Sequence, residues 1–96
     1  MNKYEAMVIV KPDLSEEERK TLFKQIDDAV TKNKGIINSS GLWQEKKKLF
    51  FPIKKQLEGV YYLVNFSSPS QAIKEIRHTY SLNESILRVL FTRLEE

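Results

Sequence analysis

Four segments of the chain carry the alternating or continuous apolar pattern that is typical of β-strands. They cover residues 3–11, 36–53, 60–66 and 86–94. The second segment is long for one strand, so we expect it to be bent or bulged. A turn over residues 54–59 separates it from the third strand, and the short connection predicts that these two strands form a hairpin.

Two other segments have helical spacing. Their apolar stripes are Leu22, Phe23, Ile26, Ala29 and Val30 in the first, and Ala72, Ile73, Ile76 and Tyr80 in the second. Ser15 followed by Glu18 predicts a capping box at the start of the first helix, and Gly35 is placed to occupy the C′ position at its end. For the second helix we expect Ser68 as the N-cap and Pro69 at the first helical position, where a missing N–H has no cost.

The resulting order is β-α-β-β-α-β, which predicts an α+β fold of the ferredoxin-like plait type. In that plait a four-stranded antiparallel sheet carries two helices on one face. No internal repeat or linker divides the chain, and its 96 residues suit one domain. We therefore expect a single domain over residues 1–96.

This architecture leaves one face of the sheet uncovered. We expect the helix-facing set to be Ala6, Val8, Val10, Tyr62, Val64, Phe66, Val89 and Phe91. Strand alternation then sends Met7, Ile9, Tyr61, Leu63, Ile86 and Leu90 to the open face. An exposed apolar patch of this kind usually marks a protein-partner surface. Alternatively, neighbouring long side chains screen some of these residues, or a register shift of one residue inverts the assignment.

The positive charge of the chain is concentrated in one short segment. The chain has 16 basic and 13 acidic residues, a net charge of +3. Residues 45–58 alone contain Lys46, Lys47, Lys48, Lys54 and Lys55 against two glutamates, which equals the whole excess. Such a local field attracts polyanions, nucleic acid first among them. The alternative is a solvated lysine face that keeps the protein soluble.

The residues that most catalytic and metal sites require are scarce. Cysteine is absent, which excludes disulfides and thiolate chemistry. His78 is the only histidine, and the three glycines are isolated rather than gathered in a phosphate-binding loop. No apolar run approaches the ~18 residues of a membrane span. We therefore expect a cytoplasmic protein that is no enzyme and that has no metal, cofactor, small-molecule substrate or membrane partner.

The order of several short motifs resembles the bacterial small-subunit (30S) ribosomal protein S6 family over almost the whole chain. The matching motifs are Lys3-Tyr4-Glu5, Pro12-Asp13-Leu14, Gly35, Trp43 to Lys54, Gly59-Val60-Tyr61-Tyr62 and Ile86-Leu87-Arg88. In the second strand the family pattern is approximately Trp-Gly, two or three basic or polar residues, then Leu-Ala-Tyr-Pro-Ile. This chain keeps Leu49, Pro52 and Ile53 but has no such glycine, and one more residue separates Trp43 from Leu49.

The resemblance implies a non-catalytic component of the ribosome with the plait fold. Members of the family bind the central domain of 16S ribosomal RNA together with a small basic protein, ribosomal protein S18. Carried onto this chain, the candidate phosphate contacts are Lys46, Lys47 and Lys48, with Lys3 and Arg88 as further candidates. Lys54 and Lys55 are added by the charge argument.

Two other functions share the same fold. An RNA-recognition-type module would read single strands by stacking bases on Tyr61 and Tyr62. A protein-interaction plait would use its open face to form a homodimer. Trp43, beside the lysines, either packs at the edge of the core or stacks on a base or sugar.

Overall fold

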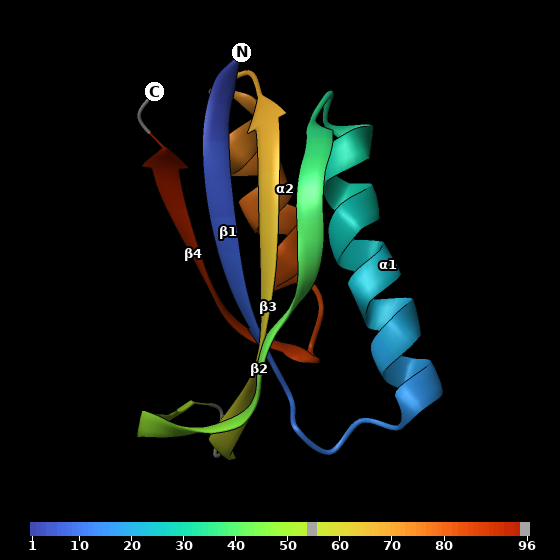
Figure 1. The fold of residues 1–96 in the computed structure, drawn as a ribbon, viewed down its shortest axis with the longest axis vertical. Coiled ribbons are helices and arrows are strands. Elements are labelled where there is room, and N and C mark those ends of the chain that lie inside the picture. The colour runs from blue at the N-terminus through green and yellow to red at the C-terminus, as the bar shows by residue number, and fades with distance from the viewer. Residues whose placement is uncertain (54–55, 95–96) are drawn as a thin grey trace.

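The computed structural model describes the backbone of residues 1–53 and 56–94, and the side chains of residues 1–43 and 58–94. The elements are β1 (Asn2–Val10), α1 (Glu16–Lys32), β2 (Ile36–Ile53), β3 (Gln56–Ser68), α2 (Ala72–Ser81) and β4 (Ile86–Leu94). The sheet has the order β2-β3-β1-β4, and all neighbouring strands are antiparallel. In Figure 1 α2 lies behind the sheet, α1 runs beside and along β2, and the face toward the viewer is open. Side chains of both helices belong to one core cluster with the inward side chains of the strands. The predicted plait is therefore confirmed.

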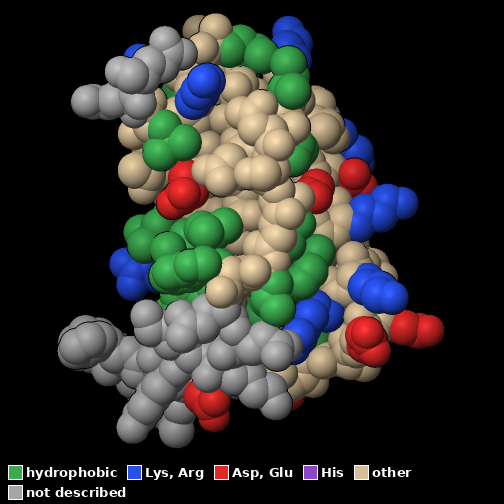
Figure 2. All heavy atoms as spheres, viewed as in Figure 1, with side chains coloured by type: hydrophobic (Ala, Val, Ile, Leu, Met, Phe, Trp, Pro, Cys, Tyr) green, Lys and Arg blue, Asp and Glu red, His purple; other side chains and the backbone are tan. Residues whose placement is uncertain are grey.

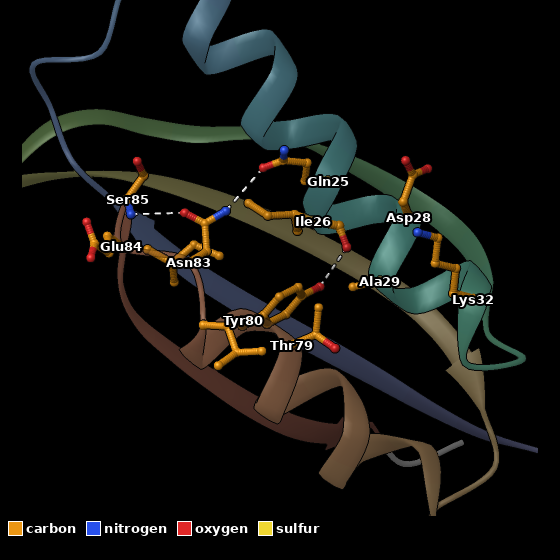
Figure 3. Close-up of a pocket in the computed structure, with 12 residues that line it drawn as sticks. Gln25, Ile26, Asp28, Ala29, Lys32, Thr79, Tyr80, Asn83, Glu84 and Ser85 are labelled. Carbon is orange, nitrogen blue, oxygen red and sulfur yellow. Dashed lines mark hydrogen bonds between the residues drawn. The ribbon is translucent and has the colours of Figure 1, made fainter.

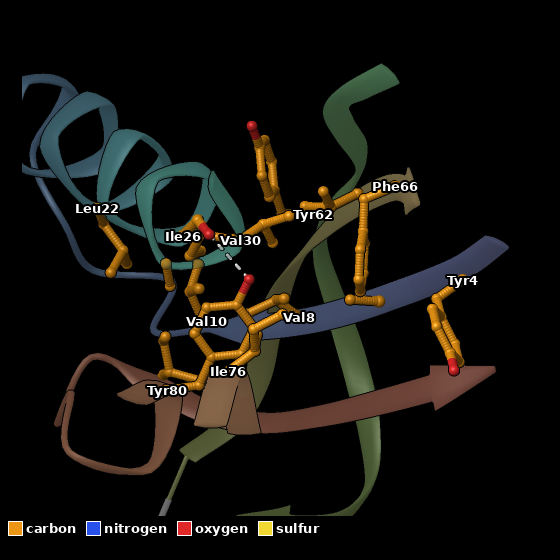
Figure 4. Close-up of a cluster of buried hydrophobic side chains, with 14 of the residues drawn as sticks. Tyr4, Val8, Val10, Leu22, Ile26, Val30, Tyr62, Phe66, Ile76 and Tyr80 are labelled. Carbon is orange, nitrogen blue, oxygen red and sulfur yellow. Dashed lines mark hydrogen bonds between the residues drawn. The ribbon is translucent and has the colours of Figure 1, made fainter. Parts of the chain in front are cut away.

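The core lies between the sheet and the two helices. Ala6, Val8, Val10, Val64 and Phe66 are completely buried, as the predicted strand alternation requires. Val89 and Phe91 of β4 are partly buried and pack against the same cluster. In Figure 4 Val8 and Val10 of β1 lie against Ile76 and Tyr80 of α2, and a hydrogen bond joins α2 to α1 through the core. Its donor is the Tyr80 hydroxyl and its acceptor is the Ile26 carbonyl, at 2.8 Å.

The first helix begins as predicted. The Ser15 hydroxyl accepts from the Glu18 amide at 3.1 Å, and the Ser15 amide donates to the Glu18 carboxylate at 3.0 Å. These two bonds form the predicted capping box. They satisfy one backbone donor inside the first turn and one at the cap itself.

The end of the first helix differs from the prediction. Lys34, and not Gly35, has the left-handed conformation, with φ 66°. The Gly35 amide donates to the Val30 carbonyl at 2.9 Å and the Lys34 amide to the Thr31 carbonyl at 3.3 Å, which together form a Schellman motif. Gly35 is needed for space, because a Cβ there would lie 2.7 Å from the Val30 carbonyl oxygen.

The prediction of Ser68 as the N-cap of the second helix is wrong. Ser68 is the last residue of β3, is buried, and pairs with Asn2 of β1. The helix begins at Ala72, after the Ala72 amide donates to the Pro69 carbonyl at 3.0 Å in a preceding turn. Strand pairing holds Ser68 in the sheet, so a serine before a proline is not sufficient evidence of a cap.

One irregularity in β4 changes which residues face outward. Val10 pairs with Ile86 and Ile9 pairs with Arg88, so Leu87 is an extra residue in β4. This bulge places Ile86 on the same side as Val10, where it is 5% exposed and belongs to the core cluster. The prediction that Ile86 faces outward is therefore wrong, because it assumed unbroken alternation along the strand.

Candidate partner and RNA interface

Strand register aligns the open-face side chains in rows that cross the sheet. One row contains Leu63 of β3, Met7 of β1 and Leu90 of β4. The next row toward the β2–β3 hairpin contains Tyr61, Ile9 and Arg88 on the same three strands. Figure 2 shows hydrophobic side chains gathered over this part of the open face. We call the side chains of Met7, Ile9, Tyr61, Leu63 and Leu90 the apolar patch.

The members of the apolar patch are exposed to different degrees. Leu90 is 49% exposed, whereas Met7, Tyr61 and Leu63 are partly buried by their neighbours. Ile9 occupies the predicted outer position but is only 5% exposed. Ile9 therefore supports the patch from within, and Leu90 offers the most apolar surface to a partner.

A polar row limits the apolar patch on the side away from the hairpin. This row contains Ser39, Asn65, Glu5 and Thr92, one from each strand. The Asn65 amide group donates to the Ser39 hydroxyl at 3.1 Å, which fixes the β2 end of the row. The apolar patch thus lies between this polar row and the hairpin.

Trp43 extends the apolar surface to the edge strand. The register of β2 shifts between Leu42 and Gln44, and Trp43 lies in that irregularity. Its ring meets the Tyr61 ring edge-on, with 5.6 Å between the centroids, and half of the side chain remains exposed. The local sequence does not predict the contact between Trp43 and Tyr61, because the contact depends on the bulge in β2 and on the pairing of β2 with β3.

Tyr62 does not belong to this surface. Its ring stacks on Phe23 of α1 with 4.1 Å between the centroids, and its hydroxyl donates to the Asp27 carboxylate at 3.1 Å. The Ser40 hydroxyl donates to the same carboxylate at 3.1 Å. Burial raises the pKa of the Tyr62 phenol, and the nearby Asp27 charge adds to the rise. Of the two adjacent tyrosines, only Tyr61 can meet a ligand on the open face.

The lysine-rich segment lies next to the apolar patch in the hairpin. Strand β2 contains Lys46, Lys47 and Lys48. In the backbone register Lys47 pairs with Gly59 and Lys48 with Glu58. The side chains of these three lysines are outside the described residues, as are Lys54 and Lys55 altogether. Gly59 is two residues from Tyr61 along β3, so the lysine segment follows directly on the aromatic row.

The two remaining basic candidates lie at different distances from that segment. Arg88 is exposed and shares a row with Tyr61 and Ile9, at the β4 edge of the apolar patch. Lys3 is exposed beside Ser67, eight residues along β3 from Gly59. At about 3.3 Å per residue this separation is roughly 26 Å. The fold therefore brings Arg88 toward the hairpin but places Lys3 at the other end of the sheet.

The described residues contain neither a converging group of metal ligands nor a membrane-spanning helix. Among them, no group of three or more histidines, cysteines or carboxylates converges. No helix in the described part of the chain is both long and apolar enough to cross a bilayer. His78 is exposed in the last turn of α2.

Comparison of the sequence and the fold with known proteins identifies one family. The family model "Ribosomal protein S6" matches residues 3–93. Two proteins named "Small ribosomal subunit protein bS6", from Thermoanaerobacter pseudethanolicus and Clostridium acetobutylicum, are 41% and 38% identical over the full length of both chains. The crystal structure of 30S ribosomal protein S6 from Thermotoga maritima superposes with a TM-score of 0.88 at 29% identity, covering 97% of this chain and 87% of that one. The C-terminal domain of MgtC from Mycobacterium tuberculosis, with a TM-score of 0.68 at 10% identity, shares the fold alone. The chain therefore belongs to the ribosomal protein S6 family.

Proposed function

We propose that this chain is one RNA-binding domain of the small ribosomal subunit that binds the central domain of 16S ribosomal RNA together with ribosomal protein S18. The relatives named as small-subunit proteins support this assignment. In this arrangement the hairpin binds RNA, and the open face of the sheet binds the protein partner. The observation that carries it is the position of the apolar patch directly beside the segment that holds the whole net charge.

The chemistry of the open face favours a polypeptide as its partner. One row across β3, β1 and β4 consists of Leu63, Met7 and Leu90 and contains no charged side chain. Apolar side chains gain nothing from phosphate, but they gain about 25 cal/mol for each Å² that a protein partner removes from water. Arg88 and the polar row would then form the hydrogen-bonding rim that surrounds such an interface.

The chemistry of residues 45–58 favours a polyanion. Each phosphate that a lysine neutralises releases counterions, so the log–log slope of affinity against salt is at most about −0.9 per contact. With five lysines in the segment, some of them idle, we expect roughly two to four phosphate contacts. This number is too small for tight binding by the chain alone, and a second protein on the apolar patch supplies the remaining affinity.

The test is a titration of a central-domain 16S RNA fragment with the purified chain, in the presence and absence of S18. We expect markedly tighter binding when S18 is present and a salt slope that reports two to four phosphates. Equal affinity with and without S18 would refute the joint binding. Binding that does not depend on salt would refute the role of the lysines.

A second candidate function rests on the Trp43–Tyr61 pair. The half-exposed ring of Trp43 and the partly buried ring of Tyr61, in contact on the open face, resemble the stacking platform of a single-strand RNA reader. Against it, Ile9 occupies the central strand beside Tyr61, where such a reader needs another aromatic ring. If the chain reads single strands, Tyr61→Ala costs about 1–3 kcal/mol in binding to a short oligonucleotide. An unchanged affinity for the oligonucleotide would exclude this candidate.

A further inference from the structure

The side of the molecule opposite the apolar patch contains an open groove. It lies between α1 and the end of α2, and the loop from α2 to β4 closes one side (Figure 3). Its volume is about 640 Å³. Ile26, Ala29, Tyr80 and Ile86 line it with buried apolar side chains, whereas Leu82 lines it while remaining 71% exposed. Leu82 therefore offers exposed apolar surface at the rim of a concave surface.

The groove continues along the first helix. A second hollow, lined by Leu14, Glu17, Glu18, Thr21 and Leu22 among others, shares Gln25, Asn83 and Ser85 with the first. The Asn83 side-chain amide donates to the Gln25 carbonyl oxygen at 3.1 Å, which ties the loop to α1 between the two hollows. The two hollows therefore adjoin at this bond, and we call them together the groove.

The side chains that line the groove have a net negative charge, whereas the chain as a whole has a net positive charge. Four acidic side chains, Glu17, Glu18, Asp28 and Glu84, line the groove against the single cation Lys32. Bonds from Ser15 lower the pKa of Glu18, so this carboxylate stays ionised well below neutral pH. Lys20 and Lys24 belong to the same helix but do not line the described groove. An acidic lining repels phosphate and attracts cationic side chains.

We propose that this acidic groove binds a lysine- or arginine-rich segment of another polypeptide, which places an apolar side chain against Leu82. Amphipathic segments dock in grooves in this way, with apolar anchors inward and charges on the rim. The basic side chains then lie near Glu84 and Asp28 at one end and near Glu17 at the other. This inference rests on the groove alone and does not depend on the proposed binding of RNA or S18.

The test uses a synthetic nine-residue peptide of alternating lysine and leucine, with blocked ends, as the probe. Its binding to the full-length chain is measured by calorimetry at low salt and mapped by amide NMR shifts. The groove variant is Glu17→Gln with Glu84→Gln. The matched control is Glu16→Gln with Glu75→Gln, which removes the same charge from exposed acids outside the groove. A third variant, Leu82→Ser, removes the apolar anchor.

We expect about fivefold weaker binding for the groove variant, less than twofold for the control, and shifts confined to the groove. Leu82→Ser should weaken binding about threefold without affecting charge. Equal losses in both glutamine variants would overturn the proposal, because they would show attraction to net charge only. Equal binding of a peptide with glutamate in place of lysine would also overturn it. Failure of the chain to bind 16S RNA would leave the groove results intact and would count only against the proposed function.

Discussion

Replacing Leu90 by serine should weaken joint binding with S18 about fivefold. Leu90 is 49% exposed at the β4 end of the apolar patch, so a partner that covers it removes about half of a leucine side chain from water. Burying a whole leucine side chain is worth about 1.5–3 kcal/mol, and half of it is worth about 1 kcal/mol. A change of this size corresponds to about a fivefold change in the dissociation constant. The free energy of unfolding of the free chain should fall by about 1 kcal/mol, because the fold buries the other half of the Leu90 side chain, so the titration is run where the variant is fully folded.

The assay is the RNA titration with S18, repeated for Leu90→Ser and for Ile36→Ser. Ile36 is 57% exposed at the start of β2, outside the apolar patch and the groove, and provides the matched control for a lost surface side chain. Ile36→Ser should bind RNA and S18 like the wild type, and Leu90→Ser should bind RNA like the wild type when S18 is absent. If Leu90→Ser binds normally with S18 present, the apolar patch does not contact that protein. If both variants lose affinity equally, the effect is not specific to the apolar patch.

Three further predictions concern stability, each read from urea unfolding. Lys34→Gly should raise the free energy of unfolding by about 0.5–1 kcal/mol, because the left-handed backbone costs lysine about 1–2 kcal/mol and glycine's extra entropy loss offsets part of the gain. Glu18→Ala should destabilise the chain at pH 7, and the difference should shrink as the pH falls through the lowered pKa of Glu18, because the protonated acid accepts from the Ser15 amide more weakly than the carboxylate does. Tyr80→Phe removes the bond to Ile26 and should cost about 1 kcal/mol at pH 7. Burial raises the pKa of Tyr80, so the wild type should lose stability as the pH rises above about 10, and Tyr80→Phe should lose it less steeply.

The element order and most of the core were predictable because the signals are local. Val8, Val10 and Val64 follow the two-residue period of a strand, and Ser15 with Glu18 has the spacing of a capping box. The structure confirms all five positions. A period of two or of 3.6 residues is set by backbone geometry alone, so it can be read without knowing what lies across the sheet.

The wrong predictions concern residues whose positions depend on contacts with a neighbouring strand or helix. The extra residue Leu87 is visible only in the register with β1, and it moves Ile86 from the open face into the core. Pairing with Asn2 keeps Ser68 in the sheet. The close approach of Val30 to Gly35 depends on how the helix end folds back. None of these contacts can be predicted from the local sequence pattern.

The candidate site was predictable to a similar extent. Alternation placed Met7, Leu63 and Leu90 on the open face, and the register joins them in one row. The contact between Trp43 and Tyr61 was missed, because it depends on a bulge in β2 and on the pairing of β2 with β3. The acidic groove was missed because its lining comes from two helices and a loop that are far apart in the sequence.

The most direct test of the account is the incorporation of Lys46→Gln, Lys47→Gln, Lys48→Gln into small ribosomal subunits in cells, compared with Lys20→Gln, Lys24→Gln, Lys74→Gln. Both triple variants lose the same charge, but only the first removes lysines from the segment that holds the net positive charge. Incorporation is measured as the ratio of variant to wild-type chain in purified subunits at low salt. We predict strong depletion of the first variant and normal incorporation of the second. Normal incorporation of the first variant would contradict the claim that the hairpin lysines hold this chain on ribosomal RNA.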